Sequence, residues 1–292
     1  MAECRSIRKL GEAMVFRARN FEFVYPRPVA VMGVVNVTPD SFSDGGRFSS
    51  TDAAVAYALE QEAQGAEILD IGGESTRPNA EPVSEEEELR RVLPVIQKLA
   101  GSTKAILSID TMKPRVARAA LAAGASIVND VAAHRNGPAM WEVVAEFRAG
   151  YVCMHAQGTP RTMQKNPVYA DVVREVGVFF GERLKILEAS GVATDQVVLD
   201  PGIGFGKSTE HTLQLLASLR KFVKLGRPVM VGISRKSFIE KLSGGKSNER
   251  LPGSLACATL AVADGVQFIR THDVLETVRA VRMAEAILKQ NA

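Results

Sequence analysis

The stretch VAVMGVVNVTPDSFSDGG, residues 29–46, joins seven apolar residues directly to a polar loop. An apolar run of this length without polar alternation is typical of a parallel strand that is covered on both faces. The residues that follow, beginning with Asn36, are types that hydrogen-bond ligands. The stretch therefore predicts a buried strand whose carboxyl end leads straight into a functional loop.

Seven further apolar runs have the same character. They are EILDIGG near residue 67, AILSID near 105, SIVNDV near 126, YVCMHA near 151, VVLDPGIG near 197, PVMVGISR near 228 and VQFIRTHD near 266. Helix-like stretches lie at 51–64, 84–100, 113–123, 138–148, 170–190, 210–224, 253–264 and 274–289. This alternation of strand and helix predicts an α/β fold, a (β/α)8 TIM barrel.

The residues before the first of these runs predict a separate element. Residues 16–25, FRARNFEFVY, alternate partly between apolar and polar, which indicates a short β-hairpin that closes the bottom of the barrel. We therefore divide the chain into an N-terminal extension with a hairpin, residues 1–28, and a barrel domain, residues 29–292. A chain of 292 residues with 46% hydrophobic content can bury a core of this size.

Composition excludes several classes of function. The formal net charge of +3 is far from the concentrated basic stripe that nucleic-acid binding needs. No apolar segment reaches the roughly 18 residues of a membrane span, and the first residues do not resemble a secretion signal. Cys4, Cys153 and Cys257 are widely spaced and form no CxxC pair, which argues against disulfides and zinc. We expect a soluble protein of the cytoplasm.

In a barrel of this kind the active site lies at the carboxyl ends of the strands. The residues at those ends are Asn36, residues 74–77, Asp110 with Thr111, Asn129 with Asp130, Met154 with His155, Asp200, residues 234–236, and Arg270 with His272. An acidic residue at a strand end often caps the next helix, and this interpretation suits Asp130 and Asp273. Asp110 and Asp200 have better caps nearer the helix, so we expect them to meet cationic or ligand donors.

Basic and hydroxyl side chains gather at the ends of three of these strands. Arg77, Arg235, Lys236, Arg270 and His272, with Ser75, Thr76 and Ser237, predict an anion site, because arginine and lysine bind phosphate and carboxylate. A solvated turn is the alternative for SRKSF, residues 234–238. For His155 we favour a structural role over that of a catalytic base.

The segment DPGIGFGKS, residues 200–208, contains neither a P-loop nor a dinucleotide fingerprint, since Pro201 stands where the P-loop needs glycine. A rim loop remains, with Phe205 either stacking on a ligand or packed in the core. The acidic and amide residues at the strand ends predict a ligand with a nitrogen-rich ring, and the basic residues predict a phosphate-like group on it. Asn36 offers an oxygen to Mg²⁺, and residues 38–46 form a candidate lid.

Eight motifs in order resemble the dihydropteroate synthase family of folate biosynthesis. They are MGVVNVTPDSFSDGG, GGESTRPNA, SIDT, VND, MHAQGTPRTMQ, DPGIGFGK, GISRKSF and RTHD, over about residues 29–275. The resemblance implies a transferase that condenses 6-hydroxymethyl-7,8-dihydropterin diphosphate with p-aminobenzoate to 7,8-dihydropteroate and diphosphate. It also implies a homodimer and competition by sulfonamides. The small residues of segment 253–265 allow it to pack either inside the barrel shell or against another subunit.

The resemblance assigns roles to individual residues. Catalysis falls to Asp110, Asp200, Lys236 and Arg270. The pterin site comprises Asp110, Asn129, Met154, Asp200 and Lys236; the p-aminobenzoate site comprises Pro39, Thr76, Arg77, Phe205 and Ser237; and the diphosphate site comprises Asn36, Thr76, Arg270 and His272. Asn36 would hold Mg²⁺.

Two other functions are compatible with a pterin-binding barrel. One is a methyltransferase that passes a methyl group from methyltetrahydrofolate to a corrinoid, and the other is a non-catalytic pterin-binding protein. SRKSF and the loop TPDSFSDGG argue against the methyltransferase, because that reaction has neither diphosphate nor p-aminobenzoate to bind. The non-catalytic alternative predicts gaps in the set of site residues, and none is visible.

Overall fold

The structure, a computed structural model, describes most of the chain. The described residues are 14–38, 50–77, 80–133, 135, 137–159, 161–163, 166–244, 246 and 249–291. Pro39 and nearly all of the candidate lid, residues 39–46, therefore lie outside the described residues, and so does Cys4.

Eight parallel strands form the predicted barrel. They are β3 (Ala30–Asn36), β4 (Ile68–Gly72), β5 (Ile106–Asp110), β6 (Ile127–Asp130), β7 (Gly150–Met154), β8 (Val197–Asp200), β9 (Met230–Gly232) and β10 (Phe268–Thr271). The sheet runs in the order β8-β7-β6-β5-β4-β3-β10-β9. A single parallel bridge between Leu199 and Val229 joins β8 to β9 and closes the circle. The TIM-barrel prediction is confirmed.

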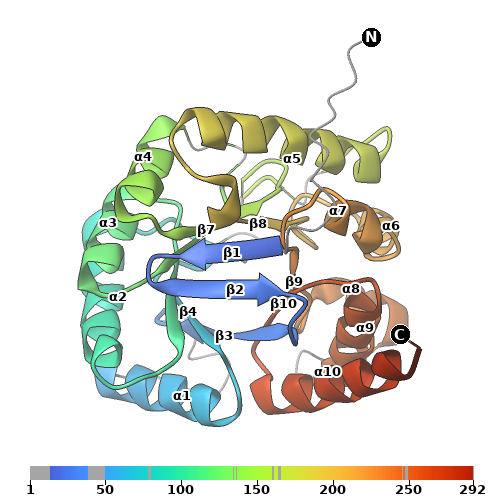
Figure 1. The fold of residues 1–292 in the computed structure, drawn as a ribbon, viewed down its shortest axis with the longest axis horizontal. Helices are drawn as coiled ribbons and strands as arrows, with labels where there is room; N and C mark the ends of the chain where they lie inside the picture. Colours follow the sequence, from blue (N-terminus) through green and yellow to red (C-terminus); the bar gives the residue numbers. More distant parts are fainter. Residues whose placement is uncertain are drawn as a thin grey trace.

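The helices surround this sheet (Figure 1). They are α1 (Thr51–Ala63), α2 (Glu85–Ala100), α3 (Pro114–Ala123), α4 (Pro138–Phe147), α5 (Val172–Ala189), α6 (Thr209–Leu216), α7 (Leu219–Val223), α8 (Ser237–Ser243), α9 (Leu251–Ala263) and α10 (Val274–Leu288). The predicted helix 210–224 is two helices, because Ser218 has ψ near 13° and leaves helical geometry. Serine caps begin α1 and α2, as the preference for hydroxyl groups at this position explains.

A hairpin of β1 (Met14–Ala18) and β2 (Phe21–Tyr25) confirms the predicted N-terminal element. It lies across the amino-terminal end of the barrel strands (Figure 1). Phe16 and Phe23 each meet Phe268 edge-on, with ring centroids 5.6 Å apart. Gly150 at the start of β7 makes room for them, since a Cβ there would lie 2.6 Å from the Phe16 ring. The hairpin thus plugs the barrel bottom, whereas the division at residue 28 stays a prediction.

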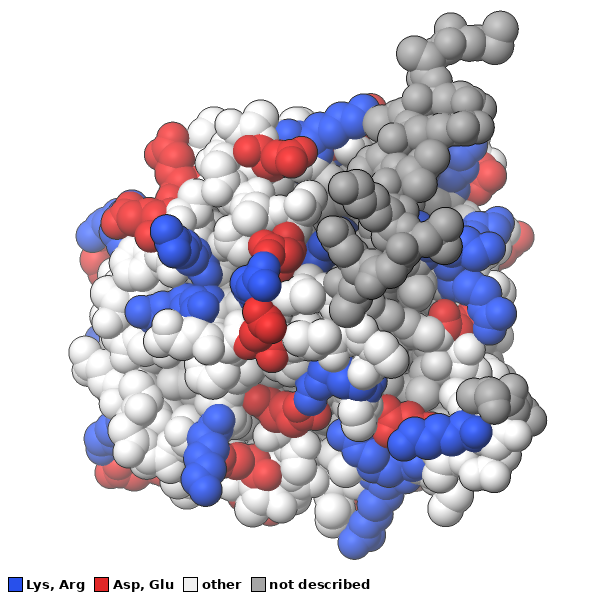
Figure 2. Space-filling view, in the orientation of Figure 1, with Lys and Arg blue, Asp and Glu red and all other residues white. Residues whose placement is uncertain are grey.

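The carboxyl ends of the strands face the other way and remain open to a cavity, which is described below. On the hairpin side, Figure 2 shows acidic and basic side chains interspersed, without a broad area of one sign. Within the described part of the chain, no helix has both the length and the apolar composition needed to cross a bilayer.

Candidate active site

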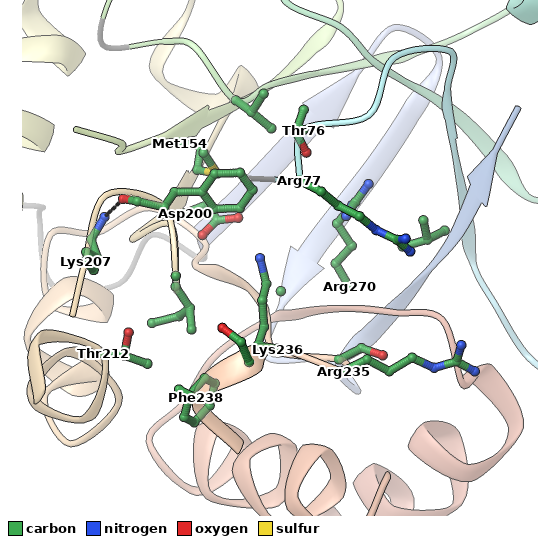
Figure 3. A pocket seen from close by; sticks show the side chains of 18 of the residues that line it. Thr76, Arg77, Met154, Asp200, Lys207, Thr212, Arg235, Lys236, Phe238 and Arg270 are labelled. Atoms are coloured by element: carbon green, nitrogen blue, oxygen red, sulfur yellow. Dashed lines mark hydrogen bonds between the residues drawn. The ribbon is translucent and has the colours of Figure 1, made fainter. Parts of the chain in front are cut away.

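A cavity of about 540 Å³ opens at the carboxyl ends of the barrel strands. Every predicted site residue that the structure describes lines it. These are Asn36, Thr76, Arg77, Asp110, Asn129, Met154, Asp200, Phe205, Lys236, Ser237, Arg270 and His272. Figure 3 shows Lys236 rising into the middle of the cavity, with Asp200 on one side and Arg270 on the other. Barrel closure brings these residues together from across the whole chain.

An arginine between two carboxylates forms the floor of the site. Arg270 Nε donates to Asp70 Oδ2 and Arg270 Nη2 donates to Asp110 Oδ2, both at 2.7 Å. Burial raises the pKa of Asp110 to about 7. The positive charge of Arg270 opposes this rise, and the negative charge of Asp70 adds to it. Asp110 therefore meets the cationic partner that the sequence predicts for it.

Asn129 and Asp200 place further acceptors in the cavity wall. Asn129 Nδ2 donates to Asp70 at 2.8 Å, and its Oδ1 is buried with no partner among the described residues. Asp200 Oδ1 accepts from the Gly202 amide at 2.7 Å. Burial raises the pKa of Asp200, although the hydrogen bond from that amide and the charge of Lys236 both act to lower it. Both side chains suit a ligand edge that donates hydrogen bonds.

Lys236 and Phe205 form the opposite wall. The ammonium of Lys236 lies 4.1 Å from the centroid of the Phe205 ring, a cation–π contact. Burial, and then the charge of Arg270, lower the pKa of Lys236 to about 8. Phe205 also packs against the cluster that contains Met154. Its two sequence interpretations are therefore both partly right, because one part of the ring packs and the ring also borders the cavity.

A second buried lysine, which the sequence analysis missed, holds the loop that carries Phe205. Lys207 Nζ donates to the carbonyls of Phe205 and His155 at 3.0 and 3.2 Å, and it lies 3.0 Å from His155 Nδ1. Gly202 in this loop has φ 64°, and a Cβ there would approach the His155 carbonyl to 1.9 Å. His155 does not line the cavity, so its favoured structural role agrees with its position.

Two strand-end carboxylates that we interpreted as helix caps have other partners. Asp273 does occupy the N-cap position of α10, but its side chain makes no cap bond and pairs with Arg235, at 2.6 Å from Oδ1 to Nη2. Asp130 accepts from the Ala132 amide and the Tyr151 hydroxyl, both at 2.8 Å, while Gly137 occupies the N-cap position of α4. The cap interpretation is wrong for Asp130, because a tight turn takes its oxygens, and for Asp273 it holds for the position but not for the side chain, which forms an ion pair.

His272 lies beside Ser234 rather than acting as a free cation. Its Nδ1 is 3.2 Å from Ser234 Oγ. Burial, followed by the charges of Arg270 and Arg235, lowers the pKa of His272 to about 3. The ring is therefore neutral near neutral pH and offers hydrogen bonds, so the positive charge of the cavity comes from its lysine and arginine side chains, Lys236 and Arg270 among them.

The sequence analysis also missed Asp70, although the motif EILDIGG carries a signal for it. Asp70 is an acidic residue inside an otherwise apolar strand, and it is fully buried. A carboxylate in that position must be paired to offset its desolvation. The partners, Ser108, Asn129 and Arg270, come from three other strands.

The barrel, and a cavity in which buried acceptors face basic side chains, agree with the class to which comparison assigns the chain, that of pterin-binding enzymes. The model of that family, described as pterin binding enzyme, matches residues 32–272. Within this class the chain belongs to the dihydropteroate synthases, which are transferases.

Three similar proteins support this assignment. The dihydropteroate synthase of Escherichia coli strain K12 is 48% identical over 258 residues, 88% of this chain and 91% of the relative. A crystal structure of the Yersinia pestis enzyme with a sulfonamide drug complex has a TM-score of 0.90 at 42% identity, covering 94% of this chain and 100% of that one. The Xanthomonas albilineans enzyme in complex with 7,8-dihydropteroate has a TM-score of 0.84 at 44% identity, covering 94% and 98%. The methyltransferase alternative is not favoured.

Proposed function

We propose that this chain condenses 6-hydroxymethyl-7,8-dihydropterin diphosphate with p-aminobenzoate, giving 7,8-dihydropteroate and diphosphate. The observation that carries the proposal is that one cavity joins buried acceptors for a nitrogen-rich ring to basic side chains, Lys236 and Arg270 among them, and to a wall that contains the Phe205 ring. The bound dihydropteroate of the Xanthomonas albilineans relative contains both halves of this product.

The pterin binds on the floor and inner wall. Asp110, Asn129 and Asp200 accept hydrogen bonds from its amino-pyrimidine edge, and a carboxylate is well matched to two parallel N–H groups. Lys236 reaches the ring, and Met154 packs against it from the apolar side. Binding would also satisfy the buried Asn129 Oδ1, which has no partner among the described residues.

The diphosphate lies beside the pterin, near Asn36, Thr76, Arg270 and His272. The donor set fits Mg²⁺ carried by the substrate, because this ion binds phosphates through one or two protein ligands and several waters. The described residues contain no cluster of three or more His, Cys, Asp or Glu that would hold a metal without the substrate. Asn36 would offer the amide oxygen, and bound Mg²⁺ would neutralise part of the leaving group's charge.

The p-aminobenzoate lies between Phe205 and the rim residues Thr76, Arg77 and Ser237. Phe205 gives the ring an aromatic surface, while Arg77 and the Ser237 hydroxyl are available to its carboxylate. Pro39, which the resemblance places in the same pocket, lies outside the described residues.

The reaction proceeds dissociatively. The C–O bond to diphosphate breaks first and its electron pair leaves with the diphosphate; the aniline nitrogen then bonds to the pterin methylene carbon and releases a proton. Arg270 and Lys236 stabilise the departing charge, and the carboxylates of Asp110 and Asp200 tolerate the pterin cation. Fixed charges of this kind are the main contribution that such a step needs from a protein.

Diphosphate release tests this proposal. The protein is incubated with the pterin diphosphate, with and without p-aminobenzoate, and with Mg²⁺ or an excess of chelator. We expect release that depends on p-aminobenzoate and falls when the chelator is present. Absence of release with both substrates and Mg²⁺ would refute the function, whereas release that ignores the chelator would refute only the role of Mg²⁺.

The lowered pKa of Lys236 predicts an alkaline limit to activity. Below about pH 8 the ammonium is charged; as the pH rises through this value the charge is lost, and substrate binding weakens. We expect kcat/KM to fall with a midpoint near pH 8, because this ratio reports groups of the free enzyme. Lys236→Arg should move the fall to higher pH, since arginine keeps its charge. If the pH at which kcat/KM falls is unchanged in that variant, the fall belongs to another titrating group.

Sulfonamides should inhibit in competition with p-aminobenzoate. They share its aniline end, and residues 200–207 contain no extra side chain beside Phe205 to exclude a sulfonyl group. In steady-state assays at varied p-aminobenzoate, sulfamethoxazole should raise the apparent KM for p-aminobenzoate without changing kcat. Inhibition that p-aminobenzoate does not relieve would show that the p-aminobenzoate pocket is not the one beside Phe205.

A homodimer through α9 and α10 is part of the proposal. Leu260 on α9 is 69% exposed, and Met283 and Ile287 on the neighbouring α10 are 64% and 60% exposed. Exposed apolar side chains grouped in this way mark contact surfaces. We expect sedimentation to show a dimer that Leu260→Glu converts to monomer. Val178→Glu, at an exposed apolar site on α5, is the matched control and should remain dimeric.

We also propose a cytoplasmic location and no nucleic-acid or membrane partner. Cys153 and Cys257 are free thiols in the described part of the chain, which is compatible with a reducing compartment. The near balance of acidic and basic residues supports small-molecule partners. Fractionation of cells that make the protein tests this, and recovery in the membrane pellet would contradict it.

A further inference from the structure

Asp70 occupies the middle of β4, inside the barrel. Along this strand Ile68 belongs to the apolar cluster at the barrel bottom, and alternation places Asp70 on the same inner face, one layer higher. The side chain is fully buried and is not among the residues that line the cavity. It therefore lies beneath the site without being part of its surface.

Each oxygen of this carboxylate has a defined donor. Oδ1 accepts from Ser108 Oγ at 2.6 Å. Oδ2 accepts from Asn129 Nδ2 at 2.8 Å and from Arg270 Nε at 2.7 Å. Asp70 thus contacts two residues of the cavity wall at once, one neutral and one charged.

The contact with Asn129 decides which way its amide points. An ionised carboxylate only accepts hydrogen bonds, so the NH2 group of Asn129 has to face Asp70. The amide oxygen is then turned away from Asp70, and it is buried without a partner in the described part of the chain. A buried acceptor without a donor is unfavourable and rare in native structures, so it points to a donor that arrives with a ligand.

We propose that Asp70 is a positioning residue that presents the amide oxygen of Asn129 to the ligand and holds the guanidinium of Arg270 beside it. The ligand partner is an N–H group of a pterin-like ring, so this inference rests on the proposed function. Asp70 touches neither substrate nor leaving group. It acts by keeping the amide oxygen of Asn129 turned toward the cavity as an acceptor and by holding the guanidinium of Arg270 beside it.

Two substitutions of Asp70 test this role, one without and one with an acceptor. Asp70→Leu removes the oxygen that receives both Asn129 and Arg270, so the Asn129 amide is no longer held in one orientation. In Asp70→Asn, an amide oxygen in the place of Oδ2 still accepts from both residues, while the NH2 group faces the Ser108 hydroxyl, which can accept from it. A role of Asp70 through its charge alone would instead predict that both variants weaken binding.

Calorimetry with 6-hydroxymethylpterin provides the measurement, with urea unfolding as the test of folding. We expect Asp70→Leu to bind about tenfold or more weakly than the wild type, which is the scale of one hydrogen bond lost at a buried acceptor. Asp70→Asn should stay within about threefold of the wild type, because its amide oxygen still accepts from Asn129 and the Asn129 oxygen still faces the ligand. Asp130→Asn, a buried carboxylate beside Asn129 that does not line the cavity, is the control and should bind like the wild type.

Other outcomes overturn the inference. Asp70→Leu that binds like the wild type would show that Asp70 positions nothing. Asp70→Asn that is folded but as weak as Asp70→Leu would show that the orientation of Asn129 is not the cause. If Asp70→Leu does not fold, Asp70→Ala, which also lacks the acceptor, takes its place in the comparison. Failure of the wild type to bind 6-hydroxymethylpterin would instead contradict the proposed function.

Discussion

Replacement of Arg270 by methionine should lower the free energy of unfolding by about 3–5 kcal/mol and abolish activity. The arginine separates Asp70, which is fully buried, from Asp110, which is nearly so. Methionine keeps much of the side-chain volume but leaves both carboxylates without their cation. Removal of one partner from a buried ion pair is costly because the remaining charge stays desolvated.

The loss should depend on pH. Without Arg270 the two carboxylates repel each other, and either can relieve this by taking up a proton. Binding a proton is easier at low pH, so the destabilisation should be larger at pH 8 than at pH 5. Urea unfolding at both values gives the measurement.

Two comparisons make the Arg270 result specific. Asp110→Asn in the same chain should recover part of the loss, because one of the two unpaired charges is removed. Arg118→Met breaks the exposed ion pair with Glu146 and should leave the free energy of unfolding almost unchanged, because solvent screens such pairs. A loss for Arg270→Met as small as that for Arg118→Met would show that the buried network does not stabilise the fold.

Asp200→Asn should weaken pterin binding by about a hundredfold while the protein stays folded. The carboxylate has two oxygens to accept from the pterin edge, and an unpaired buried donor costs about 1–3 kcal/mol. Asparagine retains one oxygen, which can keep the 2.7 Å bond from the Gly202 amide, so the loop should hold its position. The amide NH2 then faces pterin donors, which adds repulsion to the lost bond.

Calorimetry with 6-hydroxymethylpterin and a thermal unfolding curve check this result together. Asp130→Asn again serves as the control, because Asp130 is also a buried carboxylate at a strand end, on β6, which is separated from β8 by one strand. Unchanged pterin affinity in Asp200→Asn would remove Asp200 from the site. A large fall in unfolding temperature would instead assign the effect to the loop.

Local patterns in the sequence predict the fold and the position of the site. Each barrel strand is an apolar run, and the motif at its carboxyl end reaches the cavity because parallel strands bring all these ends to one side. For this reason Asp110, Asn129 and Asp200 could be assigned from three separate motifs. The hairpin was also predictable, since its alternation involves only neighbouring residues.

The pairings between those motifs were not predictable. Asp70 and Arg270 are 200 positions apart, and their contact exists only after the barrel closes. The same is true of Asp273, which has the sequence of a cap but pairs with Arg235 from the adjoining strand end. Burial then decides charge, so that His272, one of a set of basic residues in the sequence, is neutral in the cavity.

The sequence by itself determined the barrel, the hairpin and the set of side chains that face the cavity, because these depend on the period of apolar residues and on which residues follow each strand. Only the tertiary structure decided which of those side chains are paired, which are charged and which remain free for a ligand. Those properties depend on distances between strands and on the removal of water, and neither is a property of residues that are neighbours along the chain.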